Sequence, residues 1–228
     1  MFLSYEIAAS PVPAHVYTIL VDVRRILVVA LGILFCSPSV LAAGRPVLVC
    51  FGDSITAGYG VDPGKSYPDA LQQDLDRHHY LYKVLNRGTS GATTKDAVAA
   101  LPEILRLHPD IVIVEFGGND GLRGLPLDQT RRNLDTVIAQ LQAAGAKVLL
   151  AGITLPPNYG PDYIHAFAQV FAELAQKHSV AFVPMIYKDL ITVPGTIQDD
   201  GIHPTAKGAV IIADTLLPAL KPLLHKGT

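Results

Sequence analysis

The sequence predicts an α/β protein, a three-layer α/β/α sandwich around a five-stranded parallel sheet. Short apolar runs alternate with longer helical patterns from residue 47 onward, which is the pattern of strands joined by crossover helices. The run at residues 111–114 has no polar alternation, as expected of a strand covered on both faces. Polar signatures follow several of these runs. In a parallel sheet the loops after the strands meet at one edge, so these signatures are expected to lie close together.

Five apolar runs are expected to form the strands, at residues 46–51, 83–86, 111–116, 147–153 and 180–184. The longer stretches are expected to form five helices, at residues 66–77, 94–107, 127–144, 162–178 and 205–224. In the third helix, apolar residues recur at helical spacing from residue 130 to residue 141, and Gly145 follows as a stop signal. The series has no repeat and no interdomain linker, so it indicates one domain.

Composition and charge narrow the range of possible functions. The chain has 228 residues, is 50% hydrophobic and carries a formal net charge of -2, which is typical of a globular protein. It has no basic excess, so no nucleic-acid partner is expected. The histidines outside the C-terminal signature have no paired ligand spacing, and we expect no metal site.

The N-terminal region has the layout of a secretory signal peptide. Paired arginines precede an apolar run at residues 26–36, and small residues follow at 40–43. The run is shorter than the ~20 residues that a membrane-spanning helix needs, which favours cleavage over retention as an anchor. We therefore expect residues 1–43 to be an N-terminal extension and signal peptide, and residues 44–228 to be a secreted or periplasmic domain.

Cysteine usage excludes an internal disulfide in that domain. Cys36 lies in the predicted signal peptide, which leaves Cys50 as the one cysteine of the mature chain. Cys50 stands in an apolar run, so we expect a buried and unreactive thiol.

Four polar signatures stand at the ends of the expected strands or before the last helix. Gly52-Asp53-Ser54 follows the first strand, Gly88-Thr89-Ser90-Gly91 the second, and Gly117-Gly118-Asn119-Asp120 the third. Asp200-Gly201-Ile202-His203 precedes the last helix. Because ligands bind at the carboxyl ends of the strands in an open α/β sheet, these loops are expected to meet on one rim.

Ser54 is the candidate nucleophile, and Gly52 is expected to let the backbone turn sharply and a substrate carbonyl approach closely. A serine hydroxyl attacks well only when a neighbouring base takes its proton, and His203 is the best candidate for that base. Asp200 can reach the other ring nitrogen, which would fix the tautomer and stabilise the imidazolium. Taken singly, Ser54 could cap a turn and His203 could be a surface residue, but the signatures together favour catalysis.

Attack on an ester carbon places negative charge on the carbonyl oxygen, and each preorganised donor there is worth roughly 3 to 4 kcal/mol. The candidate donors are the backbone N–H groups of Ser54 and Gly91 and the side-chain amide of Asn119. Turn chemistry alone could also explain Asn119. We expect Asp53 and Asp120 to order their own loops rather than to take part in bond making.

These residues together resemble the SGNH, or GDSL, hydrolases. Residues 51–54 are similar to the first block of that family, Ser90-Gly91 to the second, residues 117–120 to the third and residues 200–203 to the fifth. The resemblance runs from Leu48 to the C-terminal helix. It implies a flavodoxin-like sheet, a triad of Ser54, Asp200 and His203, oxyanion donors at Ser54, Gly91 and Asn119, and hydrolysis without metal or cofactor.

Within the family, residues 115–124 and 155–160 most resemble the periplasmic group of thioesterases, lysophospholipases and arylesterases. One departure from that group is Ala92, which stands where the second block carries an acidic residue. The resemblance therefore implies a serine esterase of acyl, aryl or lysophospholipid esters or thioesters, which acts through an acyl-enzyme. A carbohydrate O-acetyl esterase is the alternative within the family.

Three other interpretations are less well supported. The α/β-hydrolase fold places its serine in a Gly-x-Ser-x-Gly turn, and the second glycine is absent after Ser54. A nucleotide-binding protein is a second possibility, since residues 60–66 resemble a phosphate-binding loop, but three residues separate the glycines where that loop needs four. A noncatalytic ligand-binding module would be expected to lack a triad member, and all three are present.

The substrate is expected to be a small-molecule ester or thioester with an apolar acyl group. The loops at residues 122–126 and 155–163 are rich in Leu, Pro and Tyr and could form an apolar acyl groove, although packing could explain the same residues. Membrane contact is expected only through an uncleaved signal segment or a lipid substrate. The sequence leaves the oligomeric state open.

Overall fold

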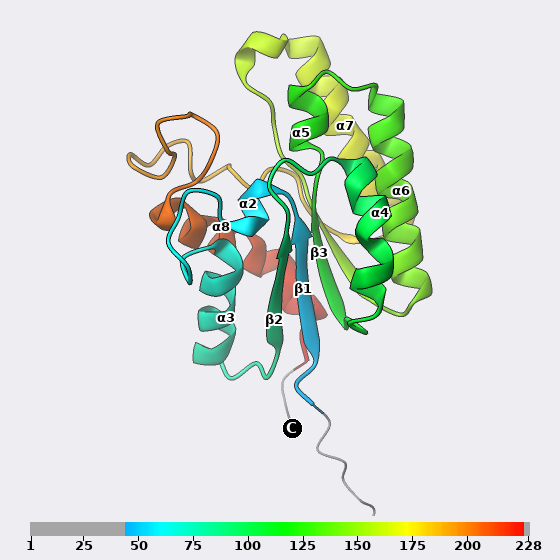
Figure 1. The fold of residues 1–228 in the computed structure, drawn as a ribbon, viewed down its shortest axis with the longest axis vertical. Coiled ribbons are helices and arrows are strands. Elements are labelled where there is room, and N and C mark those ends of the chain that lie inside the picture. Colours follow the sequence, from blue (N-terminus) through cyan, green and yellow to red (C-terminus); the bar gives the residue numbers. More distant parts are fainter. Residues whose placement is uncertain (1–43, 226–228) are drawn as a thin grey trace, which may run out of the picture. The chain divides into compact units, whose positions relative to one another are not determined.

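The computed structural model describes residues 44–225. Residues 1–43, where the extension and signal peptide are expected, lie outside the described residues, as do residues 226–228. The described part is built around a central parallel sheet with helices on both of its faces (Figure 1). No helix within residues 44–225 is both long enough and apolar enough to cross a bilayer.

The sheet has five strands, in the order β2-β1-β3-β4-β5, and every neighbouring pair is parallel. This is the flavodoxin-like order, so the predicted fold class is confirmed. The strands are β1 Val47–Gly52, β2 Lys83–Gly88, β3 Ile111–Glu115, β4 Lys147–Ala151 and β5 Ala181–Val183.

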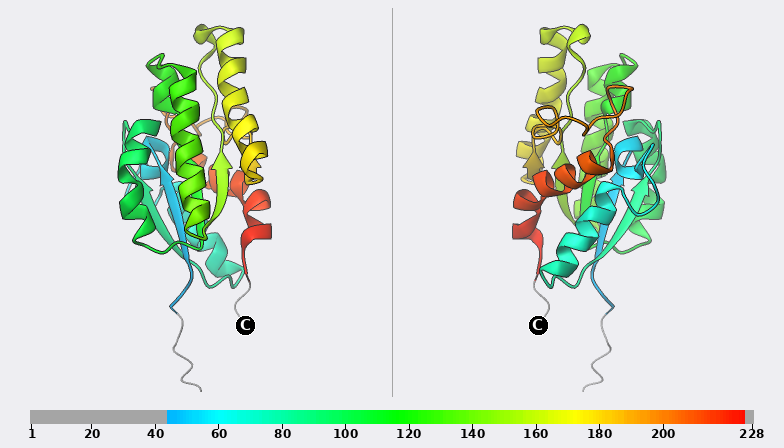
Figure 2. Two further views of the ribbon diagram at one scale, coloured as in Figure 1. Left: turned by 90° about the vertical axis from the view of Figure 1, so that its right-hand side faces the viewer. Right: turned by 90° about the vertical axis from the view of Figure 1, so that its left-hand side faces the viewer.

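Two groups of helices cover the two faces of the sheet (Figure 2). Helices α4, α6 and α7 pack side by side over one face, and α3 and α8 pack together over the other. The α-helices are α2 Ser54–Ala57, α3 Tyr67–Arg77, α4 Thr94–Leu105, α5 Gly118–Leu122, α6 Leu127–Ala143, α7 Pro161–His178 and α8 Ala206–Leu220, with 3-10 turns η1 Pro157–Tyr159 and η2 Lys221–Leu223.

All five predicted strands and all five predicted helices are present, and their bounds differ from the predictions by a few residues. The last helix differs most, because α8 gives way at Lys221 to the 3-10 turn η2. The one-turn helices α2 and α5 were not expected, since four or five residues are too few to show a helical period. Both of these helices directly follow a strand and carry residues of the polar signatures.

The order of the strands indicates where on the sheet the polar signatures meet. After β1 the chain moves to β2 on one side and then crosses to β3 on the other, so the ends of β1 and β3 form a topological switch point. Gly52, the last residue of β1, pairs in register with Gly88 of β2 and with Glu115 of β3. The loops that follow these three strands therefore begin side by side.

The centre of β1 is fully buried, and Cys50 lies within it. Burial raises the pKa of the Cys50 thiol far above its ordinary value, which leaves the thiol protonated and unreactive. The expectation of a buried thiol is confirmed.

Candidate active site

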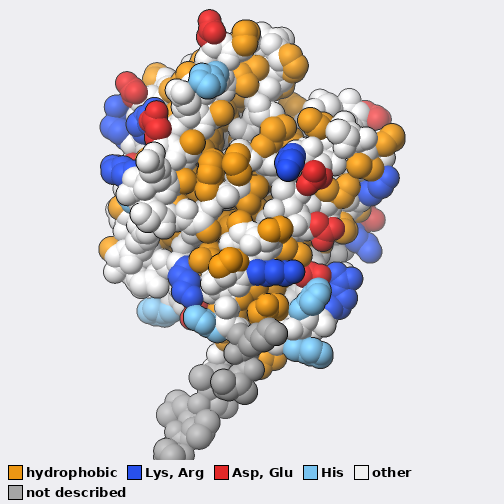
Figure 3. All heavy atoms as spheres, turned by 180° about the vertical axis from the view of Figure 1, so that it is seen from behind, with side chains coloured by type: hydrophobic (Ala, Val, Ile, Leu, Met, Phe, Trp, Pro, Cys, Tyr) orange, Lys and Arg blue, Asp and Glu red, His pale blue; other side chains and the backbone are white. Residues whose placement is uncertain are grey.

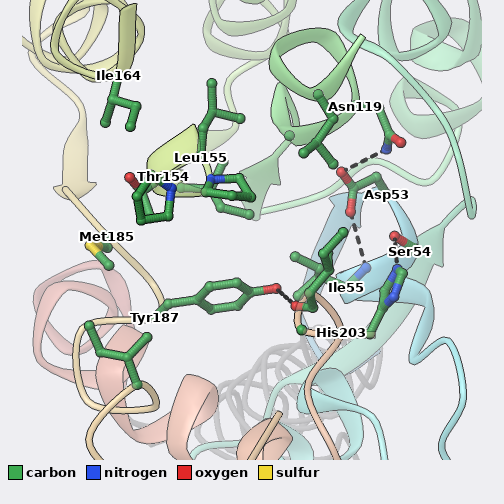
Figure 4. A pocket seen from close by; sticks show the side chains of 18 residues that line it. Asp53, Ser54, Ile55, Asn119, Thr154, Leu155, Ile164, Met185, Tyr187 and His203 are labelled. Atoms are coloured by element: carbon green, nitrogen blue, oxygen red, sulfur yellow. Dashed lines mark hydrogen bonds between the residues drawn. The ribbon is translucent and has the colours of Figure 1, made fainter. Parts of the chain in front are cut away.

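The structure brings Ser54, His203 and Asp200 into one hydrogen-bonded series. Ser54 is the first residue of α2, and its Oγ lies 3.0 Å from His203 Nε2 (Figure 4). His203 Nδ1 lies 2.6 Å from Asp200 Oδ2. The serine is 149 residues from the histidine in sequence, so the contact is made by the fold. The imidazole can take the serine proton at one nitrogen while the carboxylate holds the other.

Asp200 is held as a carboxylate by its own turn. Its Oδ1 accepts the backbone N–H groups of Ile202 and His203, at 2.9 and 3.0 Å. Partial desolvation raises the pKa of Asp200, but these two N–H groups and the His203 ring outweigh it and hold the pKa at about 2. The carboxylate is therefore charged and oriented before any substrate arrives.

The segment that follows α2, which is distant from His203 in sequence, packs against the His203 ring. The Tyr59 ring packs on the imidazole, with ring centroids 4.5 Å apart and a tilt of 44°. The Gln198 side-chain amide donates to the carbonyl oxygens of Tyr59 and Pro204, each at 2.8 Å. The segment after α2 is thus attached to the loop that carries the histidine.

A glycine is needed at position 52 because there is no room for a side chain beneath the turn, and not because the backbone conformation is unusual. Its φ angle is not positive, and a Cβ at this position would collide with Thr56 Oγ1 and lie 2.6 Å from Glu115 Oε2. The expectation that Gly52 opens the way for a substrate is therefore wrong, because its missing side chain leaves room for two buried polar groups.

Asp53 orders the turn, as the sequence predicted, and also contacts a candidate oxyanion donor. Its Oδ1 accepts the Ile55 N–H at 3.0 Å and so caps α2. Its Oδ2 accepts from Asn119 Nδ2 at 3.1 Å. Burial raises the pKa of Asp53 to about 6, although the hydrogen bonds from these groups and the charge of His203 oppose the rise.

The second aspartate, Asp120, ties α5 to α4 and α6. Its carboxylate accepts the backbone N–H and the hydroxyl of Thr94, at 2.9 and 2.5 Å, and the hydroxyl of Thr130 at 3.3 Å. Asp120 is buried and takes no part in the series that contains Ser54. It fixes the position of the helix on which Asn119 lies, as expected of a residue that orders its own loop.

The three candidate oxyanion donors lie on the adjoining loops. Among residues 44–225, no backbone hydrogen bond uses the N–H of Ser54 or of Gly91. Gly91 has a φ of +80°, a left-handed conformation that favours glycine. The Asn119 amide donates to the Ala92 carbonyl oxygen at 3.0 Å as well as to Asp53, so an oxyanion must share or replace one of these two contacts.

An apolar pocket of about 530 Å³ opens beside Ser54 and His203. Leu122, Leu155, Pro156 and Pro157 come from the two loops that the sequence singled out, and Ile164 of α7 lies beside them. The Tyr159 hydroxyl donates to the Leu122 carbonyl oxygen at 2.7 Å and so joins the two loops. We call this cavity the acyl pocket, after the acyl groove that the sequence predicted. On the face seen in Figure 3, hydrophobic side chains gather over the middle and are interrupted there by several Lys, Arg, Asp and Glu side chains.

The opposite wall of the acyl pocket was not foreseen from the sequence. Met185, Tyr187 and Ile191, from the irregular segment after β5, line it together with Ile202 (Figure 4). The Tyr187 hydroxyl donates to the Ile202 carbonyl oxygen at 2.8 Å, which attaches this wall to the residue before His203. The only signal in the sequence is a scatter of apolar residues without a period.

The segment that resembles a phosphate-binding loop has a structural role. Ser66 caps α3 and forms a capping box with Asp69, and Gly60 and Gly64 take left-handed conformations in the turns before it. In the described part of the chain, no group of three or more His, Cys, Asp or Glu side chains could hold a metal ion.

Comparisons with known proteins agree with this geometry. The model of the GDSL-like Lipase/Acylhydrolase family matches residues 50–211. The chain is 42% identical to Esterase TesA of Pseudomonas aeruginosa over 183 residues, which cover 80% of this chain and 91% of the relative. It is 37% identical to Thioesterase 1/protease 1/lysophospholipase L1 of Escherichia coli over 185 residues, 81% of this chain and 88% of the relative. A crystal structure of TesA superposes with a TM-score of 0.76 and 42% identity, covering 78% of this chain and 99% of the other.

Proposed function

The chain belongs to the GDSL-like lipase/acylhydrolase family and is a serine hydrolase of ester or thioester substrates, and we propose that Ser54, His203 and Asp200 are its catalytic triad. The observation that carries this assignment is the contact series from Ser54 Oγ through the His203 ring to Asp200. Each member has the partner that its role needs: a base for the hydroxyl and a carboxylate for the ring.

In acylation, His203 Nε2 takes the Ser54 proton while Oγ forms a bond to the carbonyl carbon. The tetrahedral intermediate then collapses, the bond to the leaving oxygen or sulfur breaks, and the imidazolium returns its proton to that atom. In deacylation, His203 takes a proton from water while the water oxygen bonds to the acyl carbon. The bond to Ser54 Oγ then breaks, and the imidazolium returns the proton to Oγ. The products are a carboxylic acid and an alcohol or thiol, and no cofactor is needed.

The Ser54 N–H, the Gly91 N–H and the Asn119 amide are the proposed oxyanion donors. The two backbone groups are not used in the hydrogen bonds of their loops within residues 44–225. The Asn119 amide donates to Asp53 and to the Ala92 carbonyl oxygen, and we expect the developing oxyanion to share one of these two N–H groups.

The proposed substrates are acyl, aryl or lysophospholipid esters and thioesters with an apolar acyl group. The acyl pocket supports this class, since its lining is mostly aliphatic and it opens directly beside Ser54. A sugar would meet few hydrogen-bonding side chains there, so no observation favours the carbohydrate O-acetyl esterase. The lysophospholipase name belongs to a relative, and a lipid substrate would give the one proposed form of membrane contact for the mature domain.

The protein is proposed to act outside the cytoplasm, secreted or periplasmic after signal peptide cleavage. The support is the sequence layout of residues 26–43, an apolar run followed by small residues. N-terminal sequencing of the protein recovered from the cell envelope or medium tests this, and an N-terminus near residue 44 is the expected result.

The test of the function is kinetics with p-nitrophenyl esters of rising chain length, together with labelling by a fluorophosphonate. We expect covalent labelling of Ser54 and a kcat/KM that rises from acetate toward octanoate, because each buried methylene adds about 0.8 kcal/mol of apolar burial. A rate that peaks at acetate and collapses by octanoate contradicts the assignment of the acyl pocket.

A further inference from the structure

Glu115 is a buried carboxyl group that the reaction described above does not use. It is the last residue of β3 and is 1% exposed. In the sheet it stands opposite Gly52, two residues before the nucleophile. An acid in such a position needs a physical reason, because burial of a polar group costs free energy unless it gains partners.

The Glu115 carboxyl holds the nucleophile turn from below. Its Oε2 accepts from Thr56 Oγ1 at 2.8 Å and from the Asp53 N–H at 3.4 Å. Thr56 Oγ1 in turn lies 3.0 Å from the Tyr67 hydroxyl. Asp53 and Thr56 stand on either side of Ser54 and Ile55, so one oxygen atom is tied to both ends of the segment that carries the nucleophile.

Gly52 and Glu115 fit each other. A Cβ at Gly52 would lie 2.6 Å from Glu115 Oε2, so the glycine leaves the space that the carboxyl fills. The other carboxyl oxygen, Oε1, is buried and has no hydrogen-bond partner among the described residues. A negative charge shared with that atom would be uncompensated, whereas a proton on it would leave an unpaired O–H group, and a buried neutral polar group costs much less free energy than a buried charge.

No ion pair within residues 44–225 includes Glu115. The titratable groups that interact with it are Asp53 of the turn, Tyr67 of α3 and Tyr187 after β5. Burial raises the pKa of Tyr67 and of Tyr187 well above the ordinary value, so both phenols are neutral. Burial and then the charge of Asp53 raise the pKa of Glu115 well above its ordinary value.

We propose that Glu115 is a positioning residue of the active site, a carboxylic acid that stays protonated and anchors the turn through Asp53 and Thr56. Because Glu115 is neutral, Asp53 is the one carboxylate of the pair, and it holds Asn119 through Oδ2. Glu115 thereby sets the position of Ser54 on one side and of Asn119 on the other. This inference rests on the proposed catalytic roles of those two residues.

Two substitutions of similar size separate positioning from filling of space. Glu115→Gln keeps a neutral group that can accept from Thr56, and Glu115→Met keeps the volume without an acceptor. We expect Glu115→Gln to retain kcat within about threefold and Glu115→Met to lose at least about tenfold in kcat with little change in KM, since a small misplacement of reacting groups is costly. Leu75→Ala, in the core of α3, is the control that lowers stability and leaves kcat unchanged.

The proton itself is tested by unfolding the wild type and Glu115→Gln in urea at several pH values. The unfolded chain releases the Glu115 proton above about pH 4.3, whereas the folded protein keeps it. The wild type therefore loses stability relative to Glu115→Gln as the pH rises, and the ratio of their unfolding constants is expected to change about tenfold per pH unit from about pH 5. A ratio that does not vary with pH means that Glu115 is ionised in the fold and overturns the proposal.

The kinetic outcomes are equally decisive. Equal kcat in Glu115→Met and the wild type overturns the positioning role, as does a Glu115→Gln enzyme as slow as Glu115→Met. If Glu115→Met does not fold, Thr56→Val removes the same hydrogen bond from the other side and is expected to lose kcat in its place. Retained activity in a Ser54→Ala variant would instead overturn the proposed function, so the two failures are distinguishable.

Discussion

The two halves of the site are built on different physical principles. We call the proposed catalytic residues Ser54, Gly91, Asn119, Asp200 and His203 the catalytic rim. Apart from Gly91, their side chains are fixed by hydrogen bonds of 2.6 to 3.1 Å. The acyl pocket is formed by aliphatic side chains from several segments, and two tyrosine hydroxyls supply ties between those segments.

The difference lies in directionality. A hydrogen bond weakens steeply when its distance or angle changes, so each position of the catalytic rim admits few residue types. Apolar contact is proportional to area and has little directional preference, so many side chains can form a pocket wall. Substitutions on the rim are therefore expected to slow every substrate alike, whereas substitutions in the pocket are expected to change the ranking of substrates.

The largest effect is expected from Ser54→Ala. Without the hydroxyl no acyl-enzyme forms, and kcat should fall by about 10⁶-fold, the scale measured for serine triads, for acetate and octanoate esters alike. The free energy of unfolding should change by less than about 1 kcal/mol, because only a small side chain is removed. Fluorophosphonate labelling that persists in this variant would show that another residue is the nucleophile.

Asn119→Ala is expected to have the next largest effect. Loss of one oxyanion donor should lower kcat by about 10² to 10³-fold with little change in KM. The loss should be the same at every chain length, because the amide would contact the carbonyl oxygen and not the acyl chain. A loss of less than about threefold would assign Asn119 to the turn alone and would remove it from the catalytic rim.

A pocket substitution tests the other half of the comparison. Ile191 lines the acyl pocket yet is 65% exposed, so Ile191→Ala should leave stability nearly unchanged. It should lower kcat/KM for octanoate by about three- to tenfold and leave acetate unchanged, as expected of one side-chain contact in a hydrophobic pocket. Val210→Ala is the matched control, since Val210 is a half-exposed aliphatic residue of α8 and does not line the pocket. Equal losses for both esters would contradict the division between rim and pocket.

The directional half of the site could be predicted from the sequence. Ser54 and Asn119 stand in short polar signatures that follow strands, and parallel strands bring such ends together whatever the intervening sequence. His203 stands in a signature before the last helix, and helix N-termini gather at the same edge of the sheet. The sheet was predictable for a related reason, since residues 111–114 of β3 are apolar throughout and form a short run of the kind expected of a buried strand.

The rest depends on contacts between segments that are distant in sequence. Met185 and Tyr187 lie in an irregular segment after β5, whose apolar residues have no period that would indicate which of them face a cavity. The sequence did not indicate that the Glu115 carboxyl is buried against the nucleophile turn, because its partner Thr56 is 59 residues away. Gly52 was expected to make room for a substrate for the same reason. The groups that occupy its space, Thr56 of α2 and Glu115 of β3, are not its neighbours in sequence.

The smallest expected effect concerns the charge of Asp200 and separates its part in stability from its part in catalysis. The pKa of Asp200 is lowered to about 2 in the fold, against about 3.9 in an unfolded chain, so ionised Asp200 stabilises the protein above about pH 4 and loses that contribution as the pH falls toward 2. The carboxylate is partly exposed, so we expect a contribution below about 1 kcal/mol. Urea unfolding of wild type and Asp200→Asn between pH 7 and pH 3 measures it, and the gap between the two should narrow at low pH. A gap that widens on acidification would contradict the lowered pKa. Because the catalytic rim is fixed by directional contacts, Asp200→Asn is expected to lose much of its kcat at neutral pH even though it loses little stability.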